Sequence, residues 1–142
     1  MQILRKENTS LRLTVWSVLG LINPSELKVL FQMVRADELC HPGSAQLIDL
    51  RAITIDGPTP EFSELFTTAR LLWRDGPGDR WALLTASPLI FGLLRMIHAL
   101  LSDSEQSHVG LHREFADASQ WLLGKVIVDP AQPTPGWSWS HA

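Results

Sequence analysis

The chain of 142 residues has few of several residue types, and each scarcity excludes a class of protein. It has no tyrosine and a single cysteine, Cys40, so no internal disulfide holds it together and a reducing compartment is favoured. Lysine occurs only at Lys6, Lys28 and Lys125, and 12 basic against 15 acidic residues give a formal net charge of −3. Because Lys and Arg do not cluster, we expect no nucleic-acid partner.

Long apolar runs are also missing. The longest lies within 88–101, is interrupted by Arg95 and His98, and is too short to span a bilayer. The start, Met1–Glu7, turns polar at once, which is unlike a signal peptide. We therefore expect no membrane insertion and a cytoplasmic location. The hydrophobic content of 45% and the charged content of 19% are typical of a folded protein, and the length fits one domain.

The stretch from Thr85 to Leu101 has the strongest pattern and predicts a helix over Ser87–Asp103. Ser87 is suited to accept backbone N–H groups of the first turn, and Pro88 fits the first helical position. At about 100° per residue, one wide apolar face results, flanked by Ile90, Leu94 and Leu101. Its members are Leu89, Leu93, Met96, Ile97 and Leu100. A face this wide predicts burial against a sheet.

Shorter patterns predict strands and helices on either side of this helix. Strands are expected at 1–7, 11–19, 46–51, 81–85 and 108–112, and helices after Asn23-Pro24, after Thr59-Pro60 and over 115–123. The first two strands favour an antiparallel hairpin, and the later alternation favours parallel pairing with right-handed crossovers. The predicted fold class is therefore α/β: a mixed, mostly parallel sheet with an antiparallel N-terminal hairpin and about four helices.

Apolar stripes give the other helices an expected inner face. The stripes are Leu27, Leu30, Phe31 and Val34, then Phe62, Leu65, Phe66, Ala69, Leu72 and Trp73, then Phe115, Ala118, Trp121 and Leu122. Asp75–Asp79 predicts a chain break before the strand at 81, and Ser102–Ser107 a polar loop.

Composition changes after residue 124, which divides the chain into a domain over 1–124 and a tail over 125–142. Pro130, Pro133, Pro135 and Gly136 predict that the tail has no regular structure beyond a short extension at its start. Its tryptophans, Trp137 and Trp139, favour an arm docked on its own domain or a neighbour, and plain disorder is the alternative.

Three segments, in this order and spacing, carry a family resemblance. They are Leu47-Ile48-Asp49-Leu50-Arg51, Ser87-Pro88-Leu89-Ile90-Phe91-Gly92-Leu93-Leu94-Arg95-Met96 and Phe115-Ala116-Asp117-Ala118-Ser119-Gln120-Trp121-Leu122. Together they resemble the STAS-like family, and more closely its small single-domain SpoIIAA-like branch, which is related to anti-sigma-factor antagonists. The resemblance covers roughly residues 1–124. It implies a sheet with helices largely on one side and a regulatory binding role without catalysis.

The resemblance also implies where a phosphorylation switch would lie. Anti-sigma antagonists carry a Ser, usually preceded by Asp, at the start of the helix after the Asp-Leu strand. Here the segment 55–60 has no Asp-Ser pair, and Thr59, followed by Pro60, is the nearest hydroxyl. Thr59 is thus the phosphorylation candidate.

Several residue groups are read as structural rather than chemical. His108 and His112, beside Glu114, are too far apart on a strand to chelate one ion side by side, since four residues span roughly 13 Å. Cys40-His41 in a loop is not a thiol dyad, because the fold must place a base across from its nucleophile. No Gly-rich phosphate loop precedes a helix. We expect no metal and no cofactor.

Two groups of residues are candidates for function. The first group should lie near the carboxyl ends of parallel strands, where ligands of open α/β sheets bind, and consists of Asp49, Asp56, Thr59 and Ser87. The structural interpretation of Asp49 is that it accepts hydrogen bonds from loop amides. The outer stripe of the central helix has Phe91, Arg95 and His98 beside Gly92, with Trp16 on a mixed strand face. Arg95 over Phe91 is the structural interpretation, and an interface rich in aromatic residues and Arg the functional one.

The leading hypothesis is a non-enzymatic STAS-like module of a bacterial cytosol that binds a protein partner or itself, as a homodimer. A binder of a small apolar, lipid-like ligand between helices is the first alternative. An enzyme with an unrecognised acid-base site is the second, and Asp49, Asp56 and His98 are its candidate residues.

Overall fold

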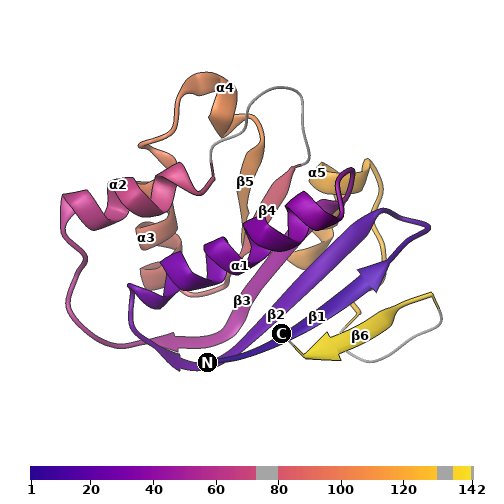
Figure 1. Cartoon of the computed structure of the whole chain (residues 1–142), viewed down its shortest axis with the longest axis horizontal. Helices are drawn as coiled ribbons and strands as arrows, with labels where there is room; N and C mark the ends of the chain where they lie inside the picture. Colours follow the sequence, from indigo (N-terminus) through magenta and orange to yellow (C-terminus); the bar gives the residue numbers. More distant parts are fainter. Residues whose placement is uncertain (73–79, 131–135, 142) are drawn as a thin grey trace.

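The computed structural model describes residues 1–72, 80–130 and 136–141, and shows a six-stranded sheet with helices on both faces (Figure 1). The strands are β1 (Gln2–Asn8), β2 (Leu13–Ile22), β3 (Ala45–Ile55), β4 (Trp81–Leu84), β5 (Val109–His112) and β6 (Ser138–His141). The helices are α1 (Glu26–Cys40), α2 (Phe62–Arg70), α3 (Pro88–His98), α4 (Asp103–Gln106) and α5 (Phe115–Leu123).

The strand order across the sheet is β5-β4-β3-β2-β1-β6. Strands β2 to β5 pair in parallel, and β1 runs antiparallel to both of its neighbours. This confirms the predicted α/β class, the antiparallel N-terminal hairpin and the parallel pairing that follows. β3 is longer than predicted, since it reaches Ile55, and this places Asp49 in the middle of the strand. β4 and β5 are each one residue shorter than predicted.

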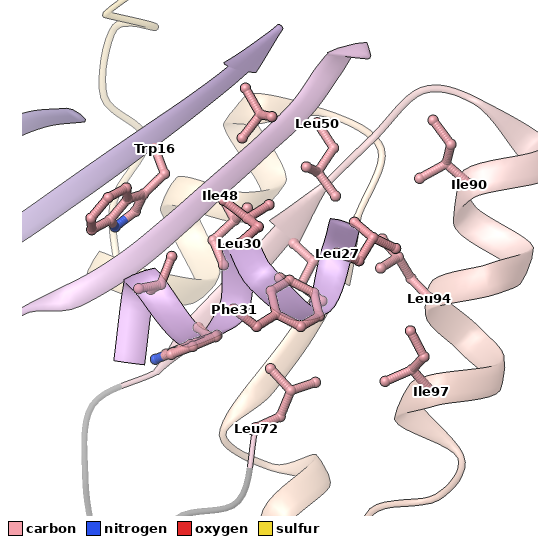
Figure 2. Packing of buried hydrophobic residues seen from close by; sticks show 14 of the residues in the cluster. Trp16, Leu27, Leu30, Phe31, Ile48, Leu50, Leu72, Ile90, Leu94 and Ile97 are labelled. Carbon is pink, nitrogen blue, oxygen red and sulfur yellow. The ribbon is translucent and has the colours of Figure 1, made fainter. Parts of the chain in front are cut away.

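The core has two parts, one on each face of the sheet. Side chains of β3 alternate between them, so that Ile48 and Leu50 pack with helices α1, α2 and α3, while Leu47 packs with α5. The larger part holds Leu27, Leu30 and Phe31 of α1 against the sheet, as Figure 2 shows. β3 is thus buried on both faces, as predicted for a central strand of a parallel sheet.

The inner face of α3 differs from the predicted one. Ile90, Leu94 and Ile97 point at the sheet in Figure 2 and are buried, whereas Leu89 is 69% exposed and Met96 46% exposed. The helix has apolar residues on more than half of its circumference, so its periodicity does not define a single inner face. Packing selects the stripe of Ile90, Leu94 and Ile97. Of the predicted face, Ile97 is therefore buried, Leu93 and Leu100 pack at the border of the core, and Leu89 and Met96 are turned away from it.

The inner face of α2 also differs from its prediction. Leu65, Thr68 and Ala69 are buried, but Phe62 is 68% exposed and Phe66 40% exposed. The two phenyl rings stack on each other, with centroids 6.4 Å apart. α2 has nine residues and buries only a narrow stripe of its surface. The smaller side chains Leu65, Thr68 and Ala69 form that stripe.

Helix ends follow the local signals closely but not completely. Ser87 caps α3 as predicted, since its hydroxyl accepts the Ile90 N–H at 3.3 Å. Asn23 accepts the Glu26 N–H at 3.1 Å, although α1 begins at Glu26 and not at Pro24. α3 ends at His98, short of Asp103, because the expected loop at 102–107 holds its own short helix, α4, which a Ser102–Glu105 capping box begins.

The tail corrects the expectation of irregular structure. Its strand β6 pairs with the edge of β1, from Glu7 opposite Ser138 to Leu4 opposite His141. Pro130 and Gly136, which has φ +90°, both lie before β6 begins at Ser138. They therefore do not interrupt the strand itself. The predicted roles of Trp73, Asp75–Asp79, Pro133 and Pro135 lie outside the described residues.

Substitution by Ala should have opposite effects on the free energy of unfolding at Gly110 and at Gly92. A Cβ on Gly110 would lie 2.5 Å from His112 Nε2 and 3.0 Å from Trp121 Cε3, so Gly110→Ala should lower the free energy of unfolding by about 1–3 kcal/mol. A Cβ on Gly92 meets nothing within 4 Å, so Gly92→Ala should raise it by about 0.5–1 kcal/mol. Urea unfolding of both variants checks this, and a stabilised Gly110→Ala would contradict the packing.

Candidate functional site

A mostly apolar pocket lies at the carboxyl edge of the parallel strands, beside α3. It measures about 430 Å³. We call it the α3 groove, and its lining is Pro24, Ile55, Asp56, Gly57, Pro58, Thr59, Pro60, Pro88, Leu89, Gly92, Leu93 and Met96. The loop after β3 forms one wall and α3 the other. This is the edge at which ligands of open α/β sheets bind.

The rotation of α3 gives the groove its apolar wall. Because Ile90, Leu94 and Ile97 face the sheet, Leu89 and Met96 are left in solvent on the adjacent side of the helix. Gly92 lies between them and has no side chain to fill the space. Exposed apolar side chains grouped around a hollow are typical of a surface that another molecule covers.

Two further hollows, of about 400 and 230 Å³, adjoin the groove and share Pro24 and Pro60 with it. The smaller one lies between α1, α2 and α3. The acidic side chains that line these three hollows are Asp56, Glu61 and Glu64, and the basic one is Lys28. The surface around the groove therefore carries more negative than positive charge.

The predicted outer stripe of α3 does not form one surface with Gly92. Phe91, Arg95 and His98 line a separate hollow of about 500 Å³, together with Ala99, Gln106 and Leu111. The cation over the Phe91 ring is Arg113, at 4.4 Å, and not Arg95 as the structural interpretation had it. His98 Nε2 lies 2.8 Å from the Val109 carbonyl oxygen, so this side chain ties α3 to β5.

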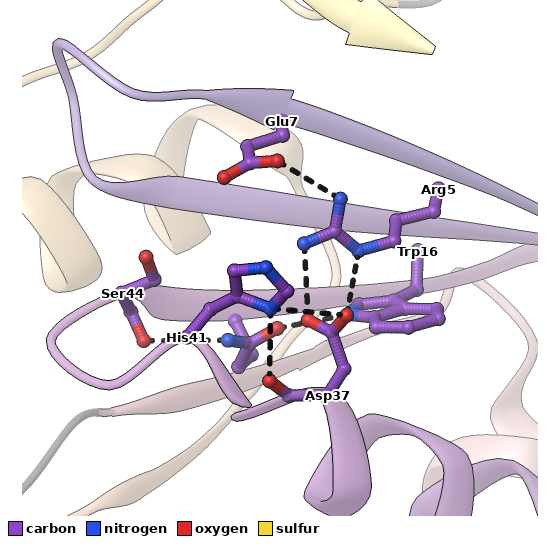
Figure 3. A network of polar contacts seen from close by, with 7 residues as sticks. Arg5, Glu7, Trp16, Asp37, His41 and Ser44 are labelled. Atoms are coloured by element: carbon purple, nitrogen blue, oxygen red, sulfur yellow. Dashed lines mark hydrogen bonds and ion pairs between the residues drawn. The ribbon is translucent and has the colours of Figure 1, made fainter. Parts of the chain in front are cut away.

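Trp16 lies in the core, which corrects its assignment to an interaction surface. Only 2% of it is exposed, because α1 covers this face of β2. Its indole N–H donates to Gln46 Oε1 at 2.8 Å, and the Arg5 guanidinium lies over its ring at 5.7 Å. Figure 3 shows Arg5 held in turn by Asp37, with Nε 3.0 Å from Oδ1. The polar network thus fastens β1 to α1.

The predicted strand-end cluster is only half formed. Asp56 and Thr59 line the groove, but Ser87 caps α3. Asp49 lies on the other face of the sheet, 2.8 Å from Arg51, which also pairs with Asp129. These carboxylates raise the pKa of Arg51. The candidate acid-base residues Asp49, Asp56 and His98 are accordingly found at three different places.

A buried lysine on the α5 side of the sheet has no counterpart in the sequence analysis. Lys6 is 4% exposed, its Nζ donates to the Pro130 carbonyl oxygen, and it lies 4.4 Å from the Trp139 ring. Burial lowers its pKa. The position of Lys6 on β1 gave no sign of this burial, because the tail residues Pro130 and Trp139 that contact it come from the far end of the chain.

The described residues 1–72, 80–130 and 136–141 contain no group of three His, Cys, Asp or Glu side chains placed to hold a metal ion. Cys40 is exposed at the end of α1, and His41 Nδ1 lies 3.2 Å from the Asp37 carbonyl oxygen. Among the described helices, none has the length and apolar character needed to cross a bilayer.

Comparisons with known proteins add no relative: the chain matches no family model, no curated protein and no solved structure. The resemblance to the STAS-like family therefore stays a prediction. The groove residues that sequence analysis missed are chiefly Leu89, Met96, Pro24 and Pro60. The sequence did contain one signal for Leu89 and Met96: α3 has more apolar residues than a single buried face can hold.

Stability should depend on pH through His112. Burial lowers the pKa of His112, with a smaller opposing effect of Asp117, and its Nε2 is buried without a hydrogen-bond partner beside Trp121. The folded state therefore binds fewer protons than the unfolded state as pH falls below about 6.5, and acid destabilises the fold there. His112→Phe should lose less stability than the wild type between pH 7.5 and 5.5, as urea unfolding measures. Parallel losses would contradict this role.

Proposed function

We propose that this protein is a STAS-like binding module without catalysis of its own, and that the α3 groove is its contact surface for a protein partner. The observation that carries the proposal is the pair of exposed apolar side chains, Leu89 and Met96, on either side of the open position Gly92. Covering such side chains stabilises a complex by about 25 cal/mol per Å² of apolar area removed from water, before the costs of association.

The shape of the groove favours a macromolecule over a small ligand. Binding sites for small ligands enclose about 70–90% of the ligand surface. Here the wall at Leu89 stands largely in solvent, and the opposite wall, Asp56–Thr59, is exposed throughout. A partner with its own apolar ridge would cover both walls, whereas a small molecule would leave them wet.

A small apolar ligand is the second candidate function. The hollow of about 230 Å³ between the helices supports it, because Leu27, Leu65, Leu93 and Ile97 supply apolar walls. Native mass spectrometry of the purified protein would show a retained ligand as added mass. A protein of the mass of its chain alone would count against this candidate.

Gly92→Arg should abolish partner binding while the fold is kept. The position is open, so the new side chain enters the groove without displacing the core. In a pull-down from the source cell, the Gly92→Arg variant should no longer retain the partner that the wild type retains. Its affinity for that partner should be at least about tenfold lower, which corresponds to about 1.4 kcal/mol. Light scattering on both proteins would show whether the partner is a second copy.

The matched controls are Gly92→Ala and Ala99→Arg. Ala99 is exposed just after α3 and lines the other hollow, so Ala99→Arg adds the same charge outside the groove. Both controls should bind as the wild type does. A partner that Gly92→Arg still retains in full would remove the groove from the function.

A further inference from the structure

The proposed contact surface also indicates which kind of partner it takes, an inference that rests on the proposed function. We propose that the α3 groove binds an amphipathic helix of a protein partner whose apolar face is flanked by Lys or Arg. Three features of the groove carry this: its position in the fold, the residue types of its lining and the charges around it.

The position of the groove excludes strand addition. Peptides that bind as an extra strand pair with a free sheet edge. The edge strands here are β5 and β6, whereas the groove lies between α3 and the loop that follows the inner strand β3. A segment in this groove meets side chains rather than a row of free backbone groups, and must satisfy its own backbone hydrogen bonds. A helix does this.

The lining separates helix binding from recognition of polyproline segments. Grooves that bind polyproline segments are lined by aromatic rings. The lining of the α3 groove, as far as the chain is described, contains no aromatic residue. Its α3 wall consists of Leu89, Leu93 and Met96, and flexible Met and Leu side chains are typical of surfaces that accept the apolar face of a helix.

The charges select a basic helix. Asp56, Glu61 and Glu64 are all exposed, and among the described residues none of these three forms an ion pair. The only basic side chain in the lining of the groove and its two neighbouring hollows is Lys28. These unpaired carboxylates lie along one wall, formed by the loop after β3 and the start of α2, and they attract a partner with Lys or Arg beside its apolar face and repel an acidic one.

The helix starts near the groove do not reverse this preference. Helix N termini attract anions through free N–H groups. In α1 and α3 these groups are partly taken by Asn23 and Ser87. The start of α2 has no side-chain cap, but the carboxylates of Glu61 and Glu64 lie there and oppose an anion. Pro88, which begins α3, has no N–H to offer. The same carboxylates disfavour fatty acids and anionic membrane surfaces.

Two designed peptides test the inference. Both have about 18 residues, enough to form a helix, and share one apolar Leu face, flanked by Lys in one and by Glu in the other. By fluorescence anisotropy, the Leu/Lys peptide should bind at least about tenfold more tightly than the Leu/Glu peptide, and the difference should shrink at high salt. Gly92→Gln, a neutral obstruction, should weaken binding of the Leu/Lys peptide.

Charge variants locate the preference. The triple variant Asp56→Asn, Glu61→Gln, Glu64→Gln should bring the two peptides to within about threefold of each other. The matched control, Asp103→Asn, Glu114→Gln, Asp117→Asn, removes three exposed carboxylates of α4 and the start of α5 and should keep the preference.

The outcomes separate this inference from the proposed function. Equal binding of both peptides, lost in Gly92→Gln, overturns the charge preference and leaves the groove as the contact surface. Binding that Gly92→Gln leaves unchanged, or no binding of either peptide, overturns the helix-binding groove. An equal loss of preference in the control triple assigns the effect to overall charge and overturns the inference. Binding to anionic phospholipid vesicles that Gly92→Gln abolishes would favour a membrane instead.

Discussion

The burial of Ile90, Leu94 and Ile97 against the sheet sets the rotation of α3, and the candidate site depends on that rotation. Each such side chain contributes about 1.5–3 kcal/mol when it leaves water. Turning the helix to hide Leu89 and Met96 would expose these three, and the sheet offers no second surface to cover them. The apolar wall of the groove is therefore a consequence of core packing and not an independent feature.

Parallel pairing of β2 to β5 explains the place of the groove. Each parallel strand must be followed by a crossover, so α1, α2 and α3 all begin at the same edge of the sheet, next to Pro24, Pro60 and Pro88. Along the lateral edge of the sheet formed by the antiparallel strand β1, the tail adds β6 and covers Lys6. The chain thus closes this lateral edge itself, whereas the groove stays open beyond the carboxyl end of β3.

Part of the candidate site was within reach of the sequence. Gly92, Asp56 and Thr59 line the groove as the strand-end rule and the small residue on the helix surface indicated. Ser87 and Asp49 were placed near function by the same rule, but a helix cap and the Arg51 ion pair occupy them. Trp16 was misplaced because alternation on one strand does not show whether a helix from elsewhere covers both faces.

The sequence by itself determined the order of β1 to β5 with α1, α2, α3 and α5, the hairpin, the start of α3 at Ser87-Pro88 and the extent of α5. These rest on caps, prolines and alternation, which act over a few neighbouring residues. Tertiary structure alone decided which apolar side chains of α2 and α3 face inward and that the tail forms β6. Those choices depend on surfaces supplied by segments distant in the chain, and no local pattern records them.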